Sequence, residues 1–190
     1  NIMKIEIIGA ESLGVRGLCC FVTVAERKIL IDPGMALGFL RNGQAPHPVQ
    51  VAVGEVTRKQ IIQAWELATD IVFSHFHGDH VPLVDANLYQ LDAALVSDLN
   101  LGVRIWTKSP DFLTVKEQKR YTALKERLDA RWKDGATGAG PLRFSVPVPH
   151  GEKTERSESV IMTRIEDDRI FVHTSDIQLL DDDTVDRVLA

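Results

Sequence analysis

Short apolar runs near the two ends of the chain predict β-strands, because their length and spacing suit extended backbone. The run at 18–24 is followed closely by another at 28–31, which predicts a hairpin with its turn at 25–27. A short apolar run at 71–74 predicts a further strand in the middle of the chain. In chain order, the predicted strands cover residues 3–8, 18–24, 28–31, 71–74, 103–107, 142–148, 159–165 and 169–174.

Between these strands, apolar residues recur at intervals that predict α-helices. Ile61, Ile62 and Trp65 recur at nearly helical intervals after Thr57, which is a suitable N-cap. Tyr121 begins a second such pattern that continues at i+3 and i+4 spacing to Trp132. The predicted helices start near Thr57, near residue 86, at Ser109 and near residue 181, and the third of them ends at Gly135.

The order of these elements favours a layered α/β or α+β architecture, since strands cluster at both ends with helices between and after them. Residues 34–56 contain glycine and proline without a regular period, which predicts a long irregular connection. With 190 residues, 44% of them hydrophobic, and a net charge of -5, the composition is that of an ordinary globular protein. We expect one domain over residues 1–190, with Met3 as the natural start and residues 1–2 as an addition to it.

The two cysteines of the chain indicate its environment. Cys19 and Cys20 are adjacent, and Cα atoms about 3.8 Å apart are closer than a disulfide normally accepts. We therefore expect two buried thiols and a reducing, cytoplasmic location. No apolar run approaches the roughly 18 residues of a membrane span, and no secretion signal is recognisable, so a membrane association is not expected.

The strongest chemical signal is one hexapeptide that follows the strand at 71–74. It holds three of the six histidines in the chain, in the sequence His75-Phe76-His77-Gly78-Asp79-His80. His75 and His77 are two residues apart where a strand ends, so their side chains point the same way. Gly78 lets the backbone fold back and present Asp79 and His80 nearby. Imidazole and carboxylate together suit Zn, Fe, Mn or Ni, so the hexapeptide predicts ligands for two adjacent metals.

Two more candidate ligands lie at comparable strand ends. His150 follows the run at 142–148, and Asp176 follows the run at 169–174. Either residue alone would more often be structural, but a catalytic metal site needs ligands from several rigid elements. We therefore predict that His150 and Asp176 join the hexapeptide.

At this point the chain resembles the metallo-β-lactamase superfamily. The resemblance rests on Asp32 at the end of an early strand, the hexapeptide, His150 and Asp176, in that order. More narrowly, residues 11–16, 29–34, 46–48 and 174–178 look like a family of uncharacterised archaeal proteins predicted to be metal-dependent hydrolases.

The superfamily resemblance implies a four-layer αββα sandwich with the metals at one edge between its two sheets. It also implies that the first metal is held by His75, His77 and His150. The second metal would be held by Asp79, His80 and Asp176, with Asp176 between the two ions.

The chain departs from the superfamily pattern at its end. That pattern finishes with another histidine, whereas the residues after Asp176 contain none. The missing histidine is consistent with three cases. The chain is a shortened member of the superfamily, a fragment of a longer protein, or a protein whose site is completed by another subunit. His173 could replace the missing ligand, but on a strand it is more readily a packed or surface histidine. An incomplete second sheet would expose an edge, which favours a homodimer.

The expected activity is hydrolysis. A metal with three protein ligands keeps an open position and lowers the pKa of bound water to about 7. We expect a metal-bound hydroxide, with zinc as the favoured metal, to attack an ester, thioester, lactone or phosphodiester. Asp79 would both hold the second metal and orient the nucleophile. Arg16, in an early glycine-bounded loop, and His47, between two prolines, are the candidate substrate-binding residues.

Three other functions stay open. Basic residues over 116–133 could contact nucleic acid, although their mixture with acidic residues is more typical of a solvated helix face. A metal-binding module that lacks catalysis would have an incomplete site on the same scaffold. An iron-dependent oxygenase would use the same ligands, because histidine and aspartate do not select zinc strongly.

Overall fold

The central sheet of the protein has six strands. The computed structural model describes residues 2–40, 42–152, 158–180 and 182–189. Neighbouring strands of this sheet follow the chain order from β1 to β6, antiparallel from β1 to β3 and parallel from β3 to β6. The strands are β1 (Lys4–Ala10), β2 (Leu18–Val24), β3 (Arg27–Ile31), β4 (Asp70–Phe73), β5 (Val103–Thr107) and β6 (Ala130–Asp134).

The carboxyl-terminal third of the chain forms a second sheet and a small strand pair. The second sheet has the strand order β12-β11-β8-β7, and β9 pairs with β10 beside it. A short helix, α3 (Asp182–Leu189), follows these strands. Their bounds are β7 (Gly138–Ala139), β8 (Leu142–Phe144), β9 (Val148–Pro149), β10 (Ser159–Val160), β11 (Thr163–Glu166) and β12 (Ile170–His173).

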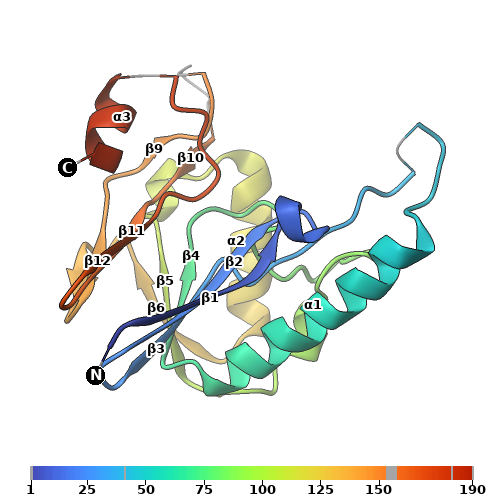
Figure 1. Cartoon of the computed structure of the whole chain (residues 1–190), viewed down its shortest axis with the longest axis horizontal. Helices are drawn as coiled ribbons and strands as arrows, with labels where there is room; N and C mark the ends of the chain where they lie inside the picture. The colour runs from blue at the N-terminus through green and yellow to red at the C-terminus, as the bar shows by residue number, and fades with distance from the viewer. Residues whose placement is uncertain (1, 41, 153–157, 181, 190) are drawn as a thin grey trace.

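Two separate cores give the described part of the chain three layers. One face of the central sheet packs against α1 (Pro48–Leu67) and α2 (Val115–Arg127) through a core that includes Ile61, Trp65 and Leu124. The opposite face packs against the second sheet through residues such as Val72 and Ile165. Figure 1 shows β11 and β12 on one side of the central sheet and α1 on the other. The layers are therefore helix, sheet and sheet.

Most predicted strands are confirmed, including the hairpin of β2 and β3. Its turn contains Ala25, which has a left-handed backbone (φ 47°). The runs predicted at 142–148 and 159–165 are each divided between two short strands, β8 and β9 in the first and β10 and β11 in the second. The helix predicted near residue 181 is confirmed as α3.

The prediction of an irregular segment up to residue 56 was wrong, because α1 begins at Pro48. His47 is its N-cap, and the His47 side chain accepts a hydrogen bond from the Val49 N–H. Thr57, the predicted cap, is a buried residue inside the helix. Gly54 weakens the helical signal, but a Cβ at this position would lie 3.3 Å from Leu37 Cδ1. Glycine is therefore explained by close packing and not by a turn.

Two other helix predictions also need correction. Residues 86–99 form turns and one 3₁₀ turn, Ala93–Leu95, because Asn87 and Asp92 accept hydrogen bonds from nearby backbone N–H groups and so favour turns. The helix predicted to continue to Gly135 ends at Arg127, and Trp132 lies on β6 instead. Pairing of β6 with β5 overrides the helical spacing of those residues.

A buried carboxylate at the start of β4 connects neighbouring strands of the central sheet. Asp70 has a fully buried side chain that binds Arg27 Nη2 at 2.5 Å. It also accepts hydrogen bonds from Arg104, the Trp106 indole and the Thr69 hydroxyl. Burial raises the pKa of Asp70, but hydrogen bonds from Arg27, Thr69 and Trp106 outweigh it and hold the pKa below its usual range.

This carboxylate predicts that the fold loses stability in acid. Because the folded pKa is lowered, Asp70 stabilises the fold above its unfolded pKa of about 3.9, and the contribution disappears as pH falls through the folded pKa. We expect Asp70→Asn to lower the free energy of unfolding at pH 7 by about 1–3 kcal/mol and to flatten its acid dependence. Urea unfolding between pH 7 and pH 3 measures both effects. The exposed Asp168→Asn is the matched control, and an unchanged pH dependence in Asp70→Asn would contradict the assignment.

Both cysteines are free and buried in the central sheet, as predicted. Burial, together with the nearby charge of Asp32, raises the pKa of Cys20 to about 12. None of the helices in the described residues has the length and apolar character to cross a membrane.

Candidate metal centre

The parallel strands bring the predicted site residues to one edge of the central sheet. β3, β4 and β5 run in the same direction, so their carboxyl ends lie together. Asp32 directly follows β3, and the turn that carries the histidine hexapeptide follows β4. His150 follows β9, and Asp176 follows β12 closely. The candidate centre therefore lies where the central sheet meets the strands of the carboxyl-terminal third.

Asp32 is the fully buried anchor of this edge. One carboxylate oxygen accepts the Ser74 N–H at 2.8 Å, and the other accepts the Ser74 hydroxyl at 2.6 Å. The second oxygen also binds His80 Nδ1 at 2.9 Å. Burial raises the pKa of Asp32, but the hydrogen bond and charge of His80 outweigh it and keep the carboxyl ionised. Asp32 thus ties the turn after β4 to the end of β3.

His75 presents an unpaired nitrogen to the interior of this edge. The Ser74 hydroxyl donates to Asp32, so the Ser74 Oγ can accept from His75 Nδ1, 2.9 Å away. This leaves the lone pair on Nε2, which is buried and has no hydrogen-bond partner among the described residues. Burial, together with the nearby His80 and His77, lowers the pKa of His75 well below its usual value, which favours the neutral form. A buried nitrogen of this kind costs about 1–3 kcal/mol unless a ligand satisfies it.

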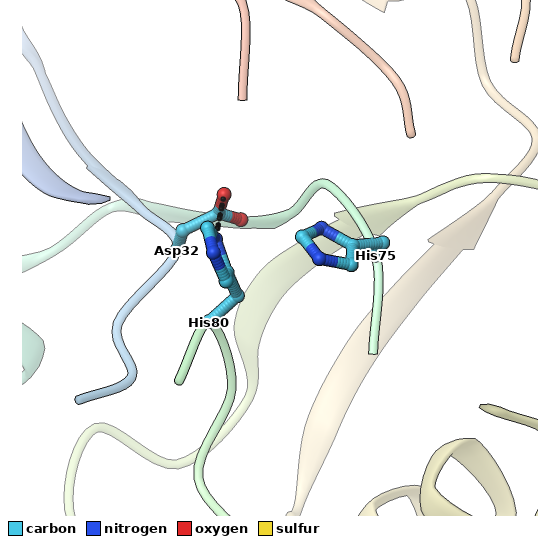
Figure 2. Close-up of side chains that lie close together, drawn as sticks. All are labelled: Asp32, His75 and His80. Carbon is cyan, nitrogen blue, oxygen red and sulfur yellow. Dashed lines mark hydrogen bonds and ion pairs between the residues drawn. The ribbon is translucent and has the colours of Figure 1, made fainter. Parts of the chain in front are cut away.

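His80 is held between two carboxylates. Its Nδ1 faces Asp32, as the dashed line in Figure 2 shows, and its Nε2 lies 3.6 Å from Asp176 Oδ2. Burial lowers the pKa of His80, but the carboxylates of Asp176 and Asp32 outweigh it and raise the pKa to about 10. The ring centroids of His80 and His75 are 4.3 Å apart, and Figure 2 shows both rings beside the Asp32 carboxylate.

His150 and Asp176 meet the same group of rings. His150 Nδ1 contacts the backbone carbonyl of Asp176, so this nitrogen donates and Nε2 carries the lone pair. Nε2 lies 3.9 Å from Asp176 Oδ2, and the ring centroids of His150 and His75 are 5.6 Å apart. The Asp176 side chain is 46% exposed, so its carboxylate lies at the mouth of the cluster.

His77 completes the set of imidazoles and brings in a residue that the sequence did not indicate. His77 Nε2 lies 2.5 Å from Glu158 Oε2, and its ring centroid lies 4.4 Å from that of His75. Glu158 itself is placed by backbone pairing, because the His150 N–H donates to the Glu158 carbonyl at 2.9 Å. The structure therefore brings seven ligand-type side chains to one place.

The ligand atoms of this cluster are close enough to share a cation. Three overlapping groups each hold three ligand atoms that lie within 4.8 Å of one another. The Asp32 oxygens are already occupied by Ser74 and His80, so Asp32 is better suited to orient ligands than to bind metal. The groups are Asp32, His75 and His80; His75, His77 and Asp176; and His77, His150 and Glu158.

The backbone around the cluster is unusually constrained. Asp32 and Ser175 both have left-handed φ angles, 48° and 60°, which are strained for residues with a Cβ. The Ser175 hydroxyl lies 2.6 Å from that of Ser74, so its strained conformation joins the end of β12 to the network under His75. A Cβ on Gly34 would lie 2.5 Å from the His80 carbonyl carbon, so only glycine fits beside the hexapeptide.

Five of the six predicted ligands lie together, namely His75, His77, His80, His150 and Asp176. Asp79 is in none of the three groups found among the described residues, and its Oδ2 lies 3.5 Å from the Arg16 guanidinium. We predicted Asp79 as a metal ligand and catalytic residue and Arg16 as a substrate-binding residue, and both roles stay predictions. The two residues are neighbours in the structure.

The other two histidines have structural partners. His173 is buried, with Nε2 2.9 Å from the Leu18 carbonyl and Nδ1 accepting from the Ser175 N–H. Both ring nitrogens are thus engaged, so His173 does not replace the missing ligand. His47 caps α1, and no contact among the described residues joins it to the cluster.

Ser74, Ser175 and Glu158 are the site residues that sequence reasoning missed. The two serines directly precede predicted ligands, so their position next to His75 and Asp176 was an available signal. Glu158 has no such signal, because only the pairing of β9 with β10 brings it beside His77.

Comparison with known proteins identifies relatives of the chain. No family model matches it. It is 45% identical to a UPF0282 protein of Methanosarcina mazei, 31% to one of Thermococcus onnurineus and 32% to one of Pyrococcus furiosus. These matches cover 99%, 98% and 96% of this chain, but 62%, 66% and 63% of the relatives. Its homologues are therefore archaeal UPF0282 proteins, and the chain spans less than two thirds of their length.

One solved structure is also similar, described as a new diphosphatase from the PhnP family. It shares 16% sequence identity with this chain, and the match covers 78% of this chain and 48% of that one. Its TM-score of 0.39 is too low to support a conclusion about fold or activity.

Proposed function

We propose that the chain carries the metal centre of a metal-dependent hydrolase with a metallo-β-lactamase-like architecture. The observation that carries this proposal is the buried Nε2 of His75, which has no hydrogen-bond partner among the described residues. Three further imidazoles and the Asp176 carboxylate surround the same space. A protein without a ligand at this position gains nothing from burying that nitrogen, whereas a divalent cation satisfies it.

The donor set fits a divalent transition metal. Three rings have Nδ1 engaged by a neighbouring group and Nε2 left toward the cluster, which is the usual arrangement of metal-binding histidines. Imidazole with carboxylate suits zinc best, and iron, manganese or nickel also fit. The two cysteines are buried in the sheet and do not contribute thiolates. We propose zinc, in one or two ions per chain.

The residues of the chain have separable roles in such a reaction. A bound divalent cation would supply Lewis-acid polarisation of the substrate and would lower the pKa of water to about 7. His75, His77, His80, His150 and Asp176 would hold the cation, and Asp176 is the most exposed of these side chains. Asp32 keeps His80 oriented through the bond to Nδ1.

Arg16 points to the substrate class. Its side chain is 60% exposed, and one Nη lies 3.5 Å from Asp79. Within the described part of the chain its other N–H donors have no partner, so they could bind an anion. Among esters, thioesters, lactones and phosphodiesters, this arrangement favours a substrate that carries negative charge, such as a phosphodiester. Asp79, which Arg16 contacts, is proposed to orient the attacking water.

The full four-layer sandwich is also part of the proposal. The described residues supply one helical layer and two sheets, with the candidate centre at the edge between the sheets. A second helical layer, on the outer face of the second sheet, is what the superfamily architecture would add. The reducing, cytoplasmic location and the homodimer are proposed with it.

Removal of metal tests the function directly. Purified protein is expected to contain about one or two equivalents of a divalent metal and to hydrolyse a chromogenic phosphodiester or ester. Dialysis against a chelator should abolish turnover, and added Zn²⁺ should restore it. Mass-spectrometric metal analysis together with the hydrolysis assay measures both.

The possible outcomes separate the alternative functions. Bound metal without hydrolysis of any ester, thioester, lactone or phosphodiester would favour a binding module. Iron with oxygen-dependent turnover would favour an oxygenase, and salt-sensitive binding of nucleic acid would favour a nuclease. No metal after reconstitution would contradict the proposed function.

A further inference from the structure

Glu158 lies against His77 by a route that is independent of the predicted ligand pattern. The Glu158 carboxylate is 31% exposed and lies 2.5 Å from His77 Nε2. Its backbone carbonyl accepts the His150 N–H, and the next residue, Ser159, pairs with Pro149 in the adjacent strand. Glu158 is therefore fixed by the same strand pair that positions His150.

The chemistry of this contact determines which nitrogen of His77 is free. An ionised carboxylate only accepts hydrogen bonds, so His77 Nε2 must carry the hydrogen. In the neutral imidazole the lone pair is then on Nδ1. A carboxylate that accepts from one ring nitrogen fixes the tautomer and makes the other nitrogen a stronger ligand.

A buried lysine connects the strand after Glu158 with the backbone of the histidine hexapeptide. Lys108 has a fully buried side chain, and its ammonium binds Glu117 at 2.8 Å and the Ser159 carbonyl at 2.5 Å. Glu117 also accepts the N–H of Phe76, the residue between His75 and His77, at 3.4 Å.

The Phe76 backbone is held on its other side too, because Arg120 donates to the Phe76 carbonyl at 2.8 Å. The segment that carries His77 and the strand β10, which begins directly after Glu158, are thus connected through one buried charge. This framework fixes the backbone next to both side chains of the contact.

We propose that Glu158 is a positioning residue, which holds His77 with Nε2 protonated and Nδ1 available for the metal. This rests on the proposed function, because it assigns His77 to the same centre. Glu158 acts through His77 and does not touch the cation itself.

The test uses Co²⁺ as the metal, because its visible absorption reports the coordination sphere. Glu158→Ala is expected to weaken Co²⁺ affinity by about 10–100-fold, measured by competition with a chelator, with the stoichiometry unchanged. Glu158→Gln, whose amide oxygen can still accept from His77, should recover most of the affinity and keep the wild-type absorption spectrum. Glu166→Gln, on the exposed end of β11, is the matched control.

A second readout needs no metal. In nitrogen-15 spectra of the metal-free protein at pH 8, His77 should carry its hydrogen on Nε2, and Glu158→Ala should remove this preference. Thermal unfolding confirms that each variant is folded.

Two results would overturn the proposal. If Glu158→Ala kept wild-type Co²⁺ affinity, Glu158 would have no positioning role. If Glu158→Gln lost as much affinity as Glu158→Ala and changed the Co²⁺ spectrum, Glu158 would be a direct ligand. Failure of the wild-type protein to bind Co²⁺ would instead contradict the proposed function.

Discussion

Replacement of His75 by alanine is expected to lower the affinity for Zn²⁺ by at least about 100-fold, because it removes a ligand rather than a group that supports one. His75 Nε2 is buried without a partner among the described residues, so a bound cation gains a preformed donor there. The same substitution should remove metal-dependent hydrolysis. Competition with a fluorescent chelator measures the affinity, and metal analysis after dialysis measures the stoichiometry.

The matched control for this variant is His47→Ala. His47 caps α1, and no contact among the described residues joins it to the cluster, so metal affinity should be unchanged. If His75→Ala retained wild-type affinity and stoichiometry, the metal centre would have to lie elsewhere in the protein.

Replacement of Asp32 by alanine is expected to lower the free energy of unfolding by about 3–5 kcal/mol, the usual effect of removing one partner from a buried charged pair. Asp32 is fully buried and accepts hydrogen bonds from the Ser74 N–H, the Ser74 hydroxyl and His80 Nδ1. Without it these donors are buried and unsatisfied, and the ring of His80 is no longer fixed. Urea unfolding at pH 7 measures the loss of stability, and Zn²⁺ titration measures the accompanying loss of affinity.

Asp32→Asn separates the charge from the shape. The asparagine oxygen can keep one acceptor, so the variant should be less destabilised than Asp32→Ala. It should also lower the pKa of His80, which the carboxylates of Asp176 and Asp32 now raise to about 10 despite burial. An Asp32→Ala protein with the wild-type unfolding midpoint would show that Asp32 is not an anchor.

Much of the site could be predicted because its ligands follow strand ends. The hexapeptide comes directly after a run of apolar residues, and parallel pairing of β3 with β4 brings its edge beside Asp32. His150 and Asp176 could be predicted for the same reason. The predicted helix bounds were less accurate than the strand bounds, and this also has a local cause. Gly54 and the valines before it weaken the helical pattern at the start of α1.

What could not be predicted depends on contacts between distant segments. Glu158 reaches His77 only through the pairing of β9 with β10, and nothing near it in sequence marks it as a site residue. Likewise, Trp132 repeats the spacing of a helix but pairs with Ile105 in the sheet. The direction of Asp79 toward Arg16 is a third case, because a motif gives residue types and spacing but not side-chain orientation.

The burial of Cys19 and Cys20 makes the protein a convenient object for site-specific labelling. Neither thiol reaches solvent, and one of them stays protonated up to about pH 12, so alkylating dyes should leave the folded chain unmodified. A single cysteine introduced at an exposed position, such as Glu152 shortly after β9, would then react alone. Fluorescence from that position would report on ligand uptake at the neighbouring cluster.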